Sequence, residues 1–175
     1  LDLTQMTDLQ HSPLLVLAYL LIFVGLGFKL ALAPFHLWAP DVYQNAPTPV
    51  AGWVGSGSKI AAAALLVTLL QPVFTSPELK AELIPALAAL AVASMVVGNL
   101  GALRQTNLKR LLAYSAIANA GYLLVGVMAF TAEGNTSVIF YILVYSLASL
   151  GAFGVVAVLT DTLGRDAEIN DFNGC

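Results

Sequence analysis

The sequence predicts an all-α polytopic membrane protein, and three observations lead to this fold class. Hydrophobic residues make up 59% of the 175 residues, charged residues make up only 10%, and apolar stretches of membrane-spanning length recur along the chain. A soluble domain is typically about 45–50% apolar and about 25% charged, and a globule of this length has too little interior to bury the excess. The composition argues against a soluble enzyme and a disordered chain, and the net charge of −3 argues against a nucleic-acid binder.

Five apolar stretches are long enough to cross a bilayer, whose core of about 30 Å takes ~20 helical residues. They cover residues 13–45, 49–70, 83–103, 108–130 and 136–160, and a polar tail follows over 161–175. The chain starts at Leu1 and breaks off within polar sequence. We therefore interpret residues 1–175 as a single membrane-domain fragment, internal to a longer protein.

The first stretch is too long for one simple span, because residues 13–45 would extend about 50 Å as a continuous helix. Pro34 removes a helix hydrogen bond and clashes with the preceding turn. We expect a helix broken near Leu32–Pro34, with a short second half that ends near Asn45. Broken helices at membrane depth are buried in protein or line wet cavities, and they often mark transport sites. A proline kink followed by an interfacial helix is the alternative.

Turn and capping signals separate the other four stretches. Thr48 before Pro49 resembles an N-cap followed by proline at the first helical position, and Thr106 is a similar cap for the fourth helix. Turn signals precede the third and fifth helices: Gln71-Pro72, Ser76-Pro77 and Glu133-Gly134-Asn135.

The basic residues predict the orientation of the fragment. Arg104, Lys109 and Arg110 cluster in the connection between the third and fourth stretches, without a nearby acidic residue. The positive-inside rule places loop 104–110 in the cytoplasm, and alternation then places residues 45–48 and the tail on the same side. The alternative is that three charges are too few to orient a fragment.

Two lysines fall where lysines are energetically costly. Lys29 and Lys59 lie near the middle of their stretches, so their charges are expected near the bilayer centre. A charge there costs at least about 2.5–3.5 kcal/mol on insertion scales, and such residues usually face a bundle interior or a water path. Burial disfavours the ammonium and a carboxylate favours it, so a carboxylate that moves can switch a lysine between holding and releasing a proton. We predict a proton relay through both lysines; the alternative is a structural lysine bonded to backbone carbonyls at a helix break.

Other polar residues have both a functional and a structural interpretation. His36 follows the expected break, where it either passes protons or bonds the loose backbone. Tyr114, Ser115 and Asn119 put polar atoms on the fourth helix, where they either line a water path or bond neighbouring helices. Asp41 is interpreted as a helix-end cap.

Cofactor chemistry has no support in the sequence. The single cysteine, Cys175, excludes an internal disulfide, a cysteine-ligated zinc site and an iron–sulfur cluster. The chain contains no Gly-rich nucleotide loop and no His/Cys metal constellation. We expect no metal, no bound cofactor and no redox chemistry in this chain.

Three long motifs resemble a known family. They are GFKLALAPFHLWAPDVYQNAPTPV over residues 27–50, GSGSKIAAA over 55–63 and GNLGALRQTNLKRLLAYSAIANAGYLL over 98–124. They resemble the proton-pumping transporter family, the antiporter-like membrane subunits of respiratory complex I. The FHLWxPDVYQxAPxPV string is most similar to the bacterial subunit N branch of NADH–quinone oxidoreductase.

The resemblance implies a fourteen-helix bundle with two inverted five-helix repeats, of which this chain would supply the seventh to eleventh helices. Lys29 matches the family's lysine on the first broken helix, and Lys59 matches the lysine of the central hydrophilic axis. A glutamate that partners the first lysine and a lysine on the second broken helix would lie outside this chain. Asn119 departs from the family, which often has histidine there, and an amide cannot exchange protons at ordinary pH.

Three functions are weighed on this basis. The first is a proton-translocating membrane-arm subunit of NADH:quinone oxidoreductase, in a bacterial inner membrane. Its partners would be other membrane-arm subunits and lipid, and the complex would use NADH, FMN, iron–sulfur clusters and quinone elsewhere. The second is a subunit of a multisubunit cation/proton antiporter. The third is a purely structural membrane module whose lysines pin the broken helix.

Overall fold

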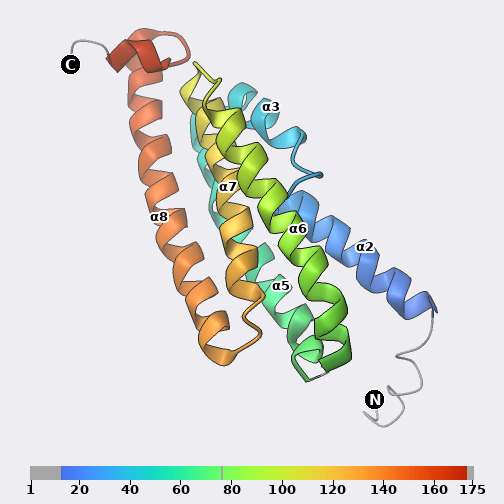
Figure 1. The fold of residues 1–175 in the computed structure, drawn as a ribbon. Coiled ribbons are helices and arrows are strands. Elements are labelled where there is room, and N and C mark those ends of the chain that lie inside the picture. Colours follow the sequence, from blue (N-terminus) through green and yellow to red (C-terminus); the bar gives the residue numbers. More distant parts are fainter. Residues whose placement is uncertain (1–12, 76, 173–175) are drawn as a thin grey trace.

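The computed structural model describes residues 13–75 and 77–172, which form a bundle of helices with no β-strand within these ranges. Figure 1 shows α6, α7 and α8 running side by side along the bundle, while α2 diverges from it. The elements are α2 (Pro13–Leu30), α3 (Trp38–Asn45), α4 (Thr48–Gly55), α5 (Gly57–Thr75), α6 (Pro77–Ala102), α7 (Leu108–Val127), α8 (Ala132–Leu163) and the 3-10 helix η2 (Ile169–Phe172).

The break in the first stretch is confirmed. Helix α2 ends at Leu30, Ala31 takes a positive φ of 62°, and the Ala33–Pro34 peptide bond is cis. The chain then turns until α3 begins at Trp38. The interior of the protein surrounds the break, since Ala31, Leu32 and Ala33 are at most 4% exposed.

A serine from another helix satisfies the backbone at the break. Ala33 N, which has no helical acceptor, donates to Ser94 Oγ of α6 at 2.9 Å. Ser94 Oγ in turn donates to Leu90 O at 2.8 Å, and the residue is fully buried. A buried N–H without a partner costs about 1–3 kcal/mol, so Ser94 removes a penalty that the break would otherwise carry.

The expected count of five transmembrane helices is one too high for the described residues. Four spans are long and apolar enough to cross a membrane: Thr48–Leu70, Leu83–Ala102, Leu108–Val127 and Ala132–Leu163. Within α2, the first stretch supplies a shorter apolar helix, Leu20–Leu30. The first stretch is therefore not among the four spans of the described residues.

The second stretch is helical but not continuous. Ser56 (φ −121°, ψ −76°) separates α4 from α5, and its Oγ donates to Gly52 O at 2.7 Å. Glycines flank the interruption at positions 55 and 57, and glycine weakens a helix by roughly 1 kcal/mol relative to alanine. Thr48 is the first residue of α4 rather than its N-cap, a position that Pro47 occupies.

Side chains cap the last two long helices. Asn107 Oδ1, not Thr106, accepts from Arg110 N at 3.1 Å at the start of α7, because Thr106 lies one residue outside the capping position. Thr131 Oγ1 accepts from Gly134 N at 3.0 Å at the start of α8. Gly164, with φ 65°, ends α8 in the left-handed conformation that glycine tolerates.

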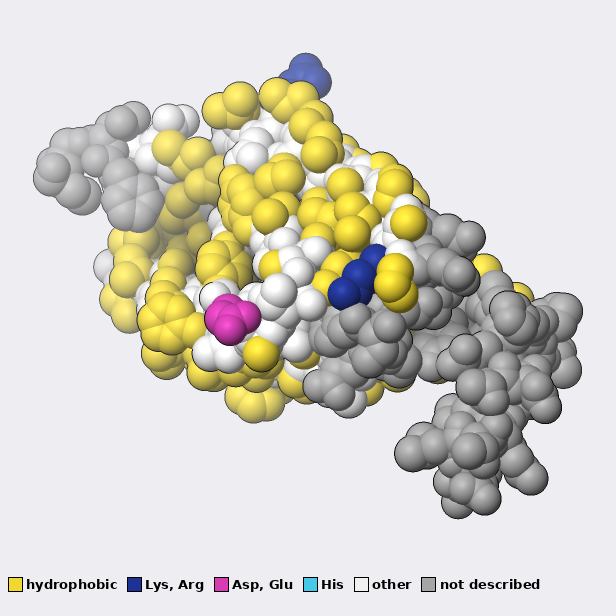
Figure 2. All heavy atoms as spheres, turned by 60° about the horizontal axis from the view of Figure 1, so that its bottom comes forward, with side chains coloured by type: hydrophobic (Ala, Val, Ile, Leu, Met, Phe, Trp, Pro, Cys, Tyr) yellow, Lys and Arg dark blue, Asp and Glu magenta, His cyan; other side chains and the backbone are white. Residues whose placement is uncertain are grey.

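Helices α6 and α7 make the most extensive contact in the bundle. A Cβ at Gly98 would lie 2.5 Å from Ala118 N, so glycine is needed for this approach. The outer surface is apolar: Leu103 is 83% exposed and Leu147 is 72% exposed. In Figure 2, hydrophobic side chains cover most of the visible described surface and charged ones are isolated, as expected for a surface that faces lipid or other membrane helices.

Candidate functional site

Lys59 lies inside the bundle, on the third residue of α5. Its relative exposure is 2%, and its Nζ donates to the backbone oxygen of Ala116 in α7 at 3.0 Å. A buried ammonium has lost its hydration and keeps only what the protein supplies. The structural alternative predicted a lysine bonded to backbone carbonyls at a helix break. The partner of Lys59 is a backbone carbonyl, but it belongs to α7, which is a regular helix at Ala116.

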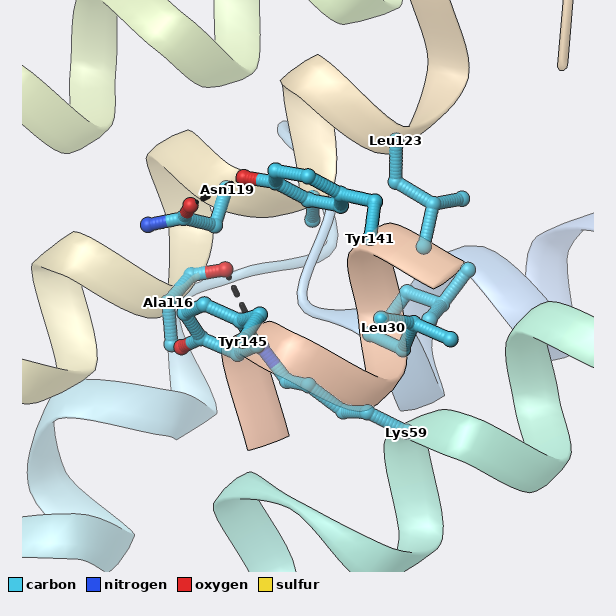
Figure 3. Close-up of a pocket in the computed structure, with 9 residues that line it drawn as sticks. Leu30, Lys59, Ala116, Asn119, Leu123, Tyr141 and Tyr145 are labelled. Atoms are coloured by element: carbon cyan, nitrogen blue, oxygen red, sulfur yellow. Dashed lines mark hydrogen bonds between the residues drawn. The ribbon is translucent and has the colours of Figure 1, made fainter. Parts of the chain in front are cut away.

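A cavity of about 10 Å³ adjoins Lys59. This volume is close to what one water molecule needs. Figure 3 shows side chains from several helices around it. The lining residues are Leu30 from α2, Lys59 from α5, Ala116, Asn119, Ala120 and Leu123 from α7, and Tyr141, Ile142 and Tyr145 from α8. None of these described lining residues carries a carboxylate.

A short chain of hydrogen bonds borders the cavity. The Tyr141 hydroxyl donates to Asn119 Oδ1 (Figure 3). Asn119 Nδ2 donates to Ser115 O at 2.8 Å and to Ser115 Oγ at 3.3 Å. The ring of Tyr145 stacks on that of Tyr141, with centroids 6.4 Å apart. The cavity therefore joins one lysine, one amide and two phenols.

The structure brings together only part of the predicted site. Lys59 and Asn119 line the same cavity, and Ser115 is bonded to Asn119. Lys29 instead lies on the exposed side of α2. The ring of Tyr114 packs against Gly101, where an added Cβ atom would lie 2.3 Å from that ring.

The remaining predicted residues surround the helix break. Pro34 lies in the turn between α2 and α3, and His36 follows it. His36 is half-buried, and its Nδ1 has no hydrogen-bond partner within the described part of the chain. Asp41 is not a side-chain cap; its Oδ1 pairs with Arg110 Nη1 at 2.6 Å.

Sequence reasoning missed Tyr141 and Tyr145. They are four residues apart on α8, so they share one helix face, and that spacing is the signal that was available. Tyrosine also serves as an ordinary core residue, so the pair does not stand out within an apolar stretch.

One end of the bundle holds a second polar cluster, formed by α3, the start of α7 and the tail after α8. Lys109 Nζ pairs with Asp166 Oδ1 at 2.8 Å and lies 3.5 Å from Ala46 O. Leu108 N donates to Ala167 O at 3.2 Å, and Ile169 N donates to Thr106 O at 2.9 Å. Residues 45–48, loop 104–110 and the tail thus meet at one end of the molecule, as the predicted topology requires.

The described residues include no group of three or more His, Cys, Asp or Glu side chains that could hold a metal ion. The polar side chains beside Lys59 are the Asn119 amide and the hydroxyls of Tyr141 and Tyr145, which form hydrogen bonds, and the lysine amine itself can also exchange protons.

Comparisons with known proteins identify one family and several relatives of this chain. A family model described as NADH:quinone oxidoreductase/Mrp antiporter, transmembrane, matches residues 1–174. NADH-quinone oxidoreductase subunit N 1 of Solidesulfovibrio magneticus is 49% identical over 163 residues, which cover 93% of this chain and 35% of that protein. The chain spans about a third of the length of the curated relatives it matches.

Two solved structures are also similar. A chain of respiratory complex I from Thermus thermophilus with bound Aureothin is 47% identical, with a TM-score of 0.67 over 84% of this chain and 31% of that chain. A chain of the membrane-bound sulfane sulfur reductase, an archaeal respiratory membrane complex, is 30% identical, with a TM-score of 0.74 over 85% and 30%.

Proposed function

Because the chain belongs to the NADH:quinone oxidoreductase/Mrp antiporter transmembrane family, we propose that its parent protein translocates protons as a membrane-arm subunit of an NADH:quinone oxidoreductase. The observation that carries this proposal is Lys59, a buried lysine beside a water-sized cavity with no carboxylate in its described lining. The names of the relatives and of one similar structure support the same assignment.

In this mechanism, electron transfer from NADH to quinone takes place in other subunits, which hold the NADH, FMN, iron–sulfur and quinone sites. The energy released there changes the electric field along the membrane arm. Lys59 responds by binding or releasing a proton, because the balance between its two protonation states depends on nearby charge. Water in the cavity passes the proton on, and Ser115 and Asn119 orient that water.

Lys29 is the second relay member in this proposal. It lies on the exposed side of α2, one residue before Leu30, which lines the cavity. A lysine at this depth is not stable against lipid, so it faces a carboxylate on another part of the parent protein. The break keeps residues 31–37 non-helical between α2 and α3, and His36 and Tyr114 either relay protons or orient water along it.

The remaining assignments follow from the same proposal. The parent protein lies in a bacterial inner membrane, among other membrane-arm subunits and lipid. The end that carries loop 104–110 faces the cytoplasm, since Arg104, Lys109 and Arg110 lie there. Cysteine labelling at Leu103, which is 83% exposed, tests this orientation from each side of sealed vesicles.

A cation/proton antiporter subunit is the second candidate, because the family model covers Mrp antiporters as well. The two functions differ in their energy source. An oxidoreductase subunit requires NADH-driven electron transfer for proton movement, whereas an antiporter exchanges Na⁺ for H⁺ without it.

The test uses the full-length parent protein in its assembled complex, in sealed vesicles, with Lys59→Ala. We expect NADH:quinone activity and proton uptake to fall together by at least tenfold, since each decade corresponds to about 1.4 kcal/mol of barrier. Lys80→Ala is the control, because Lys80 lies outside the spans with its Nζ 6.0 Å from the Phe130 ring centroid. Unchanged activity and proton yield in an assembled Lys59→Ala complex would leave Lys59 a structural lysine.

A further inference from the structure

The end of α2 closes with its own backbone hydrogen bonds before the chain reaches Ala33. Ala31 N, where φ is 62°, and Leu32 N donate to carbonyl oxygens of α2 at 3.1 Å and 2.8 Å. This pair of bonds is a Schellman motif, in which a left-handed residue ends a helix. Ala33 N is the next donor along the chain, and it donates to Ser94 Oγ of α6 at 2.9 Å. The end of α2 is thus closed by local bonds and joined to α6 at the next residue.

Ser94 lies on the face of α6 that packs against α7. Ala91 and Gly98 are three residues before it and four residues after it, so the three residues share one helix face. An added Cβ at Gly98 would lie 2.5 Å from Ala118 N, and one at Gly121 would lie 2.7 Å from Ala91 O. The close contact between these two helices therefore fixes the position of the Ser94 hydroxyl.

Helix α7 also holds the partner of Lys59, since Ala116 O accepts from Lys59 Nζ at 3.0 Å. The last residue of α2, Leu30, lines the cavity beside that lysine, and Lys29 precedes it. Helix α2 diverges from the bundle in Figure 1 and packs chiefly against α5. The bond to Ser94 therefore links the end of α2 to the pair of helices that holds Lys59.

We propose that Ser94 is a positioning residue for the proton relay: through Ala33, it holds the end of α2 in place against the α6–α7 pair. The end of α2 carries Lys29 and Leu30, whereas α7 carries the partner of Lys59. Without the serine hydroxyl, the N–H of Ala33 is a buried donor without an acceptor, and the break shifts to find one. Lys29 and Leu30 shift with it, because they belong to the same closed helix end. This inference rests on the proposed function, in which the two lysines exchange protons.

The decisive variant is Ser94→Ala in the full-length parent protein, measured in assembled complex in sealed vesicles. Amide hydrogen exchange over residues 31–33 should become about tenfold faster, since losing a buried partner shifts a local opening equilibrium by about that factor. Coupled proton translocation per assembled complex should fall by about tenfold, because a misplacement of about 1 Å can cost up to ~10²-fold in rate.

Two further variants separate positioning from general damage. Ser94→Thr keeps a hydroxyl at the same place and should restore both slow exchange and translocation. Ser146→Ala is the matched control, because Ser146 is 3% exposed and its Oγ has no hydrogen-bond partner within the described part of the chain. This control should change neither readout.

The proposal is overturned if Ser94→Ala translocates protons as fast as Ser146→Ala, or if translocation falls without faster exchange over residues 31–33. It is also overturned if an assembled Ser94→Thr complex is as slow as Ser94→Ala. If Ser94→Ala does not assemble, Ser94→Cys replaces it, since a thiol is only a weak acceptor. Reduced translocation in that variant supports the proposal, and full translocation overturns it. Lys59→Ala, measured alongside, is the separate test of the proposed function, which fails if that variant is fully active.

Discussion

Two lysines of this protein are buried to a similar degree, but they lie in different regions and have different partners. Lys59, in the centre of the bundle, is 2% exposed and bonds a backbone carbonyl at 3.0 Å. Lys109, at one end, is 6% exposed and pairs with the Asp166 carboxylate at 2.8 Å. Burial alone therefore does not mark a functional lysine in this fold.

The difference lies in what the ammonium gains from its surroundings. Asp166 is 42% exposed at its side chain and remains solvated, so Lys109 has a stable ionic partner and links α7 to the tail. Lys59 has no carboxylate in its described surroundings, so its charged form is held less firmly. A paired buried lysine stabilises structure, whereas Lys59, beside a water-sized cavity, is the lysine that we propose exchanges protons.

The largest expected effect comes from making Lys59 resemble Lys109. Asn119→Asp places a carboxylate of nearly the same shape in the cavity. The resulting ion pair should fix the ammonium and reduce coupled proton translocation by at least tenfold, because each decade requires only about 1.4 kcal/mol of extra barrier. Proton uptake in vesicles with the full-length parent protein measures the effect.

Asn99→Asp is the control for that substitution. Asn99 bonds Met95 O at 2.9 Å, the same local bond that Asn119 makes to Ser115 O, but Asn99 is exposed on α6. A fully active Asn119→Asp complex would show that a carboxylate does not immobilise Lys59, and the comparison between the two lysines would lose its basis.

A second test concerns Ser94, the buried serine that accepts a hydrogen bond from the backbone at the helix break. Ser94→Ala leaves Ala33 N–H buried without its acceptor, so the free energy of unfolding should fall by about 1–3 kcal/mol. Denaturation of the detergent-solubilised parent protein measures this. Ser137→Ala is the matched control, since Ser137 Oγ bonds Glu133 O at 2.8 Å on its own helix, α8. Equal losses in both variants would mean that the bond from Ala33 to Ser94 adds nothing.

The third prediction makes Lys109 resemble Lys59. Asp166→Asn removes the carboxylate from a buried ammonium and should lower the free energy of unfolding by about 1–2 kcal/mol, a value reduced for the exposure of Asp166. Backbone amides over residues 165–172 should exchange with deuterium faster. Proton translocation per assembled complex should stay unchanged, as it should for Glu168→Gln, whose side chain is exposed. A large loss of translocation would assign Lys109 to the relay.

The smallest effect is expected at the exposed tail. Arg165 Nη2 bonds Asp171 Oδ1 at 2.5 Å, and this bond, with the Glu168 backbone N–H, holds the pKa of Asp171 below its usual 3.8. Because the folded value is the lower one, the contribution to stability is present above about pH 4 and is lost as pH falls through the folded value.

Amide exchange of the tail, corrected for intrinsic rates, should therefore rise below about pH 4 in the native protein and change less in Arg165→Ala. The effect should be small, since the Arg165 side chain is 54% exposed and salt screens the pair. An Arg165→Ala tail with an unaltered pH response would exclude this ion pair as the cause.

Much of the fold could be predicted from the sequence, because bilayer crossing imposes a strong length and composition signal. Pro34, together with the excess length of the first stretch, was enough to predict the break. The interruption at Ser56 was missed, since its flanking glycines are equally compatible with a continuous, closely packed helix. The count of spanning helices was one too high, because the apolar helix before the break, Leu20–Leu30, is shorter than a span.

The site was harder to predict than the fold. Lys59 was identified because its charge is unusual at mid-membrane, and Asn119 and Ser115 because they are four residues apart on one helix. Tyr141 and Tyr145 enter the cavity only because α8 packs against both α5 and α7. Such contacts depend on how helices rotate about their axes, and a sequence of nearly uniform hydropathy does not specify that rotation.

The two contacts of the Lys109 ammonium, to Ala46 and to Asp166, also form in a fixed order during synthesis. Lys109 reaches back to Ala46, at the end of α3, and forward to Asp166, beyond α8. A ribosome that adds 5–20 residues per second needs on the order of ten seconds to travel from α3 to that carboxylate. Until then α7 and α3 can meet, but the ammonium between them has no counterion. The ion pair between Lys109 and Asp166 therefore forms last at this end of the bundle, after every spanning helix of this fragment has been synthesised.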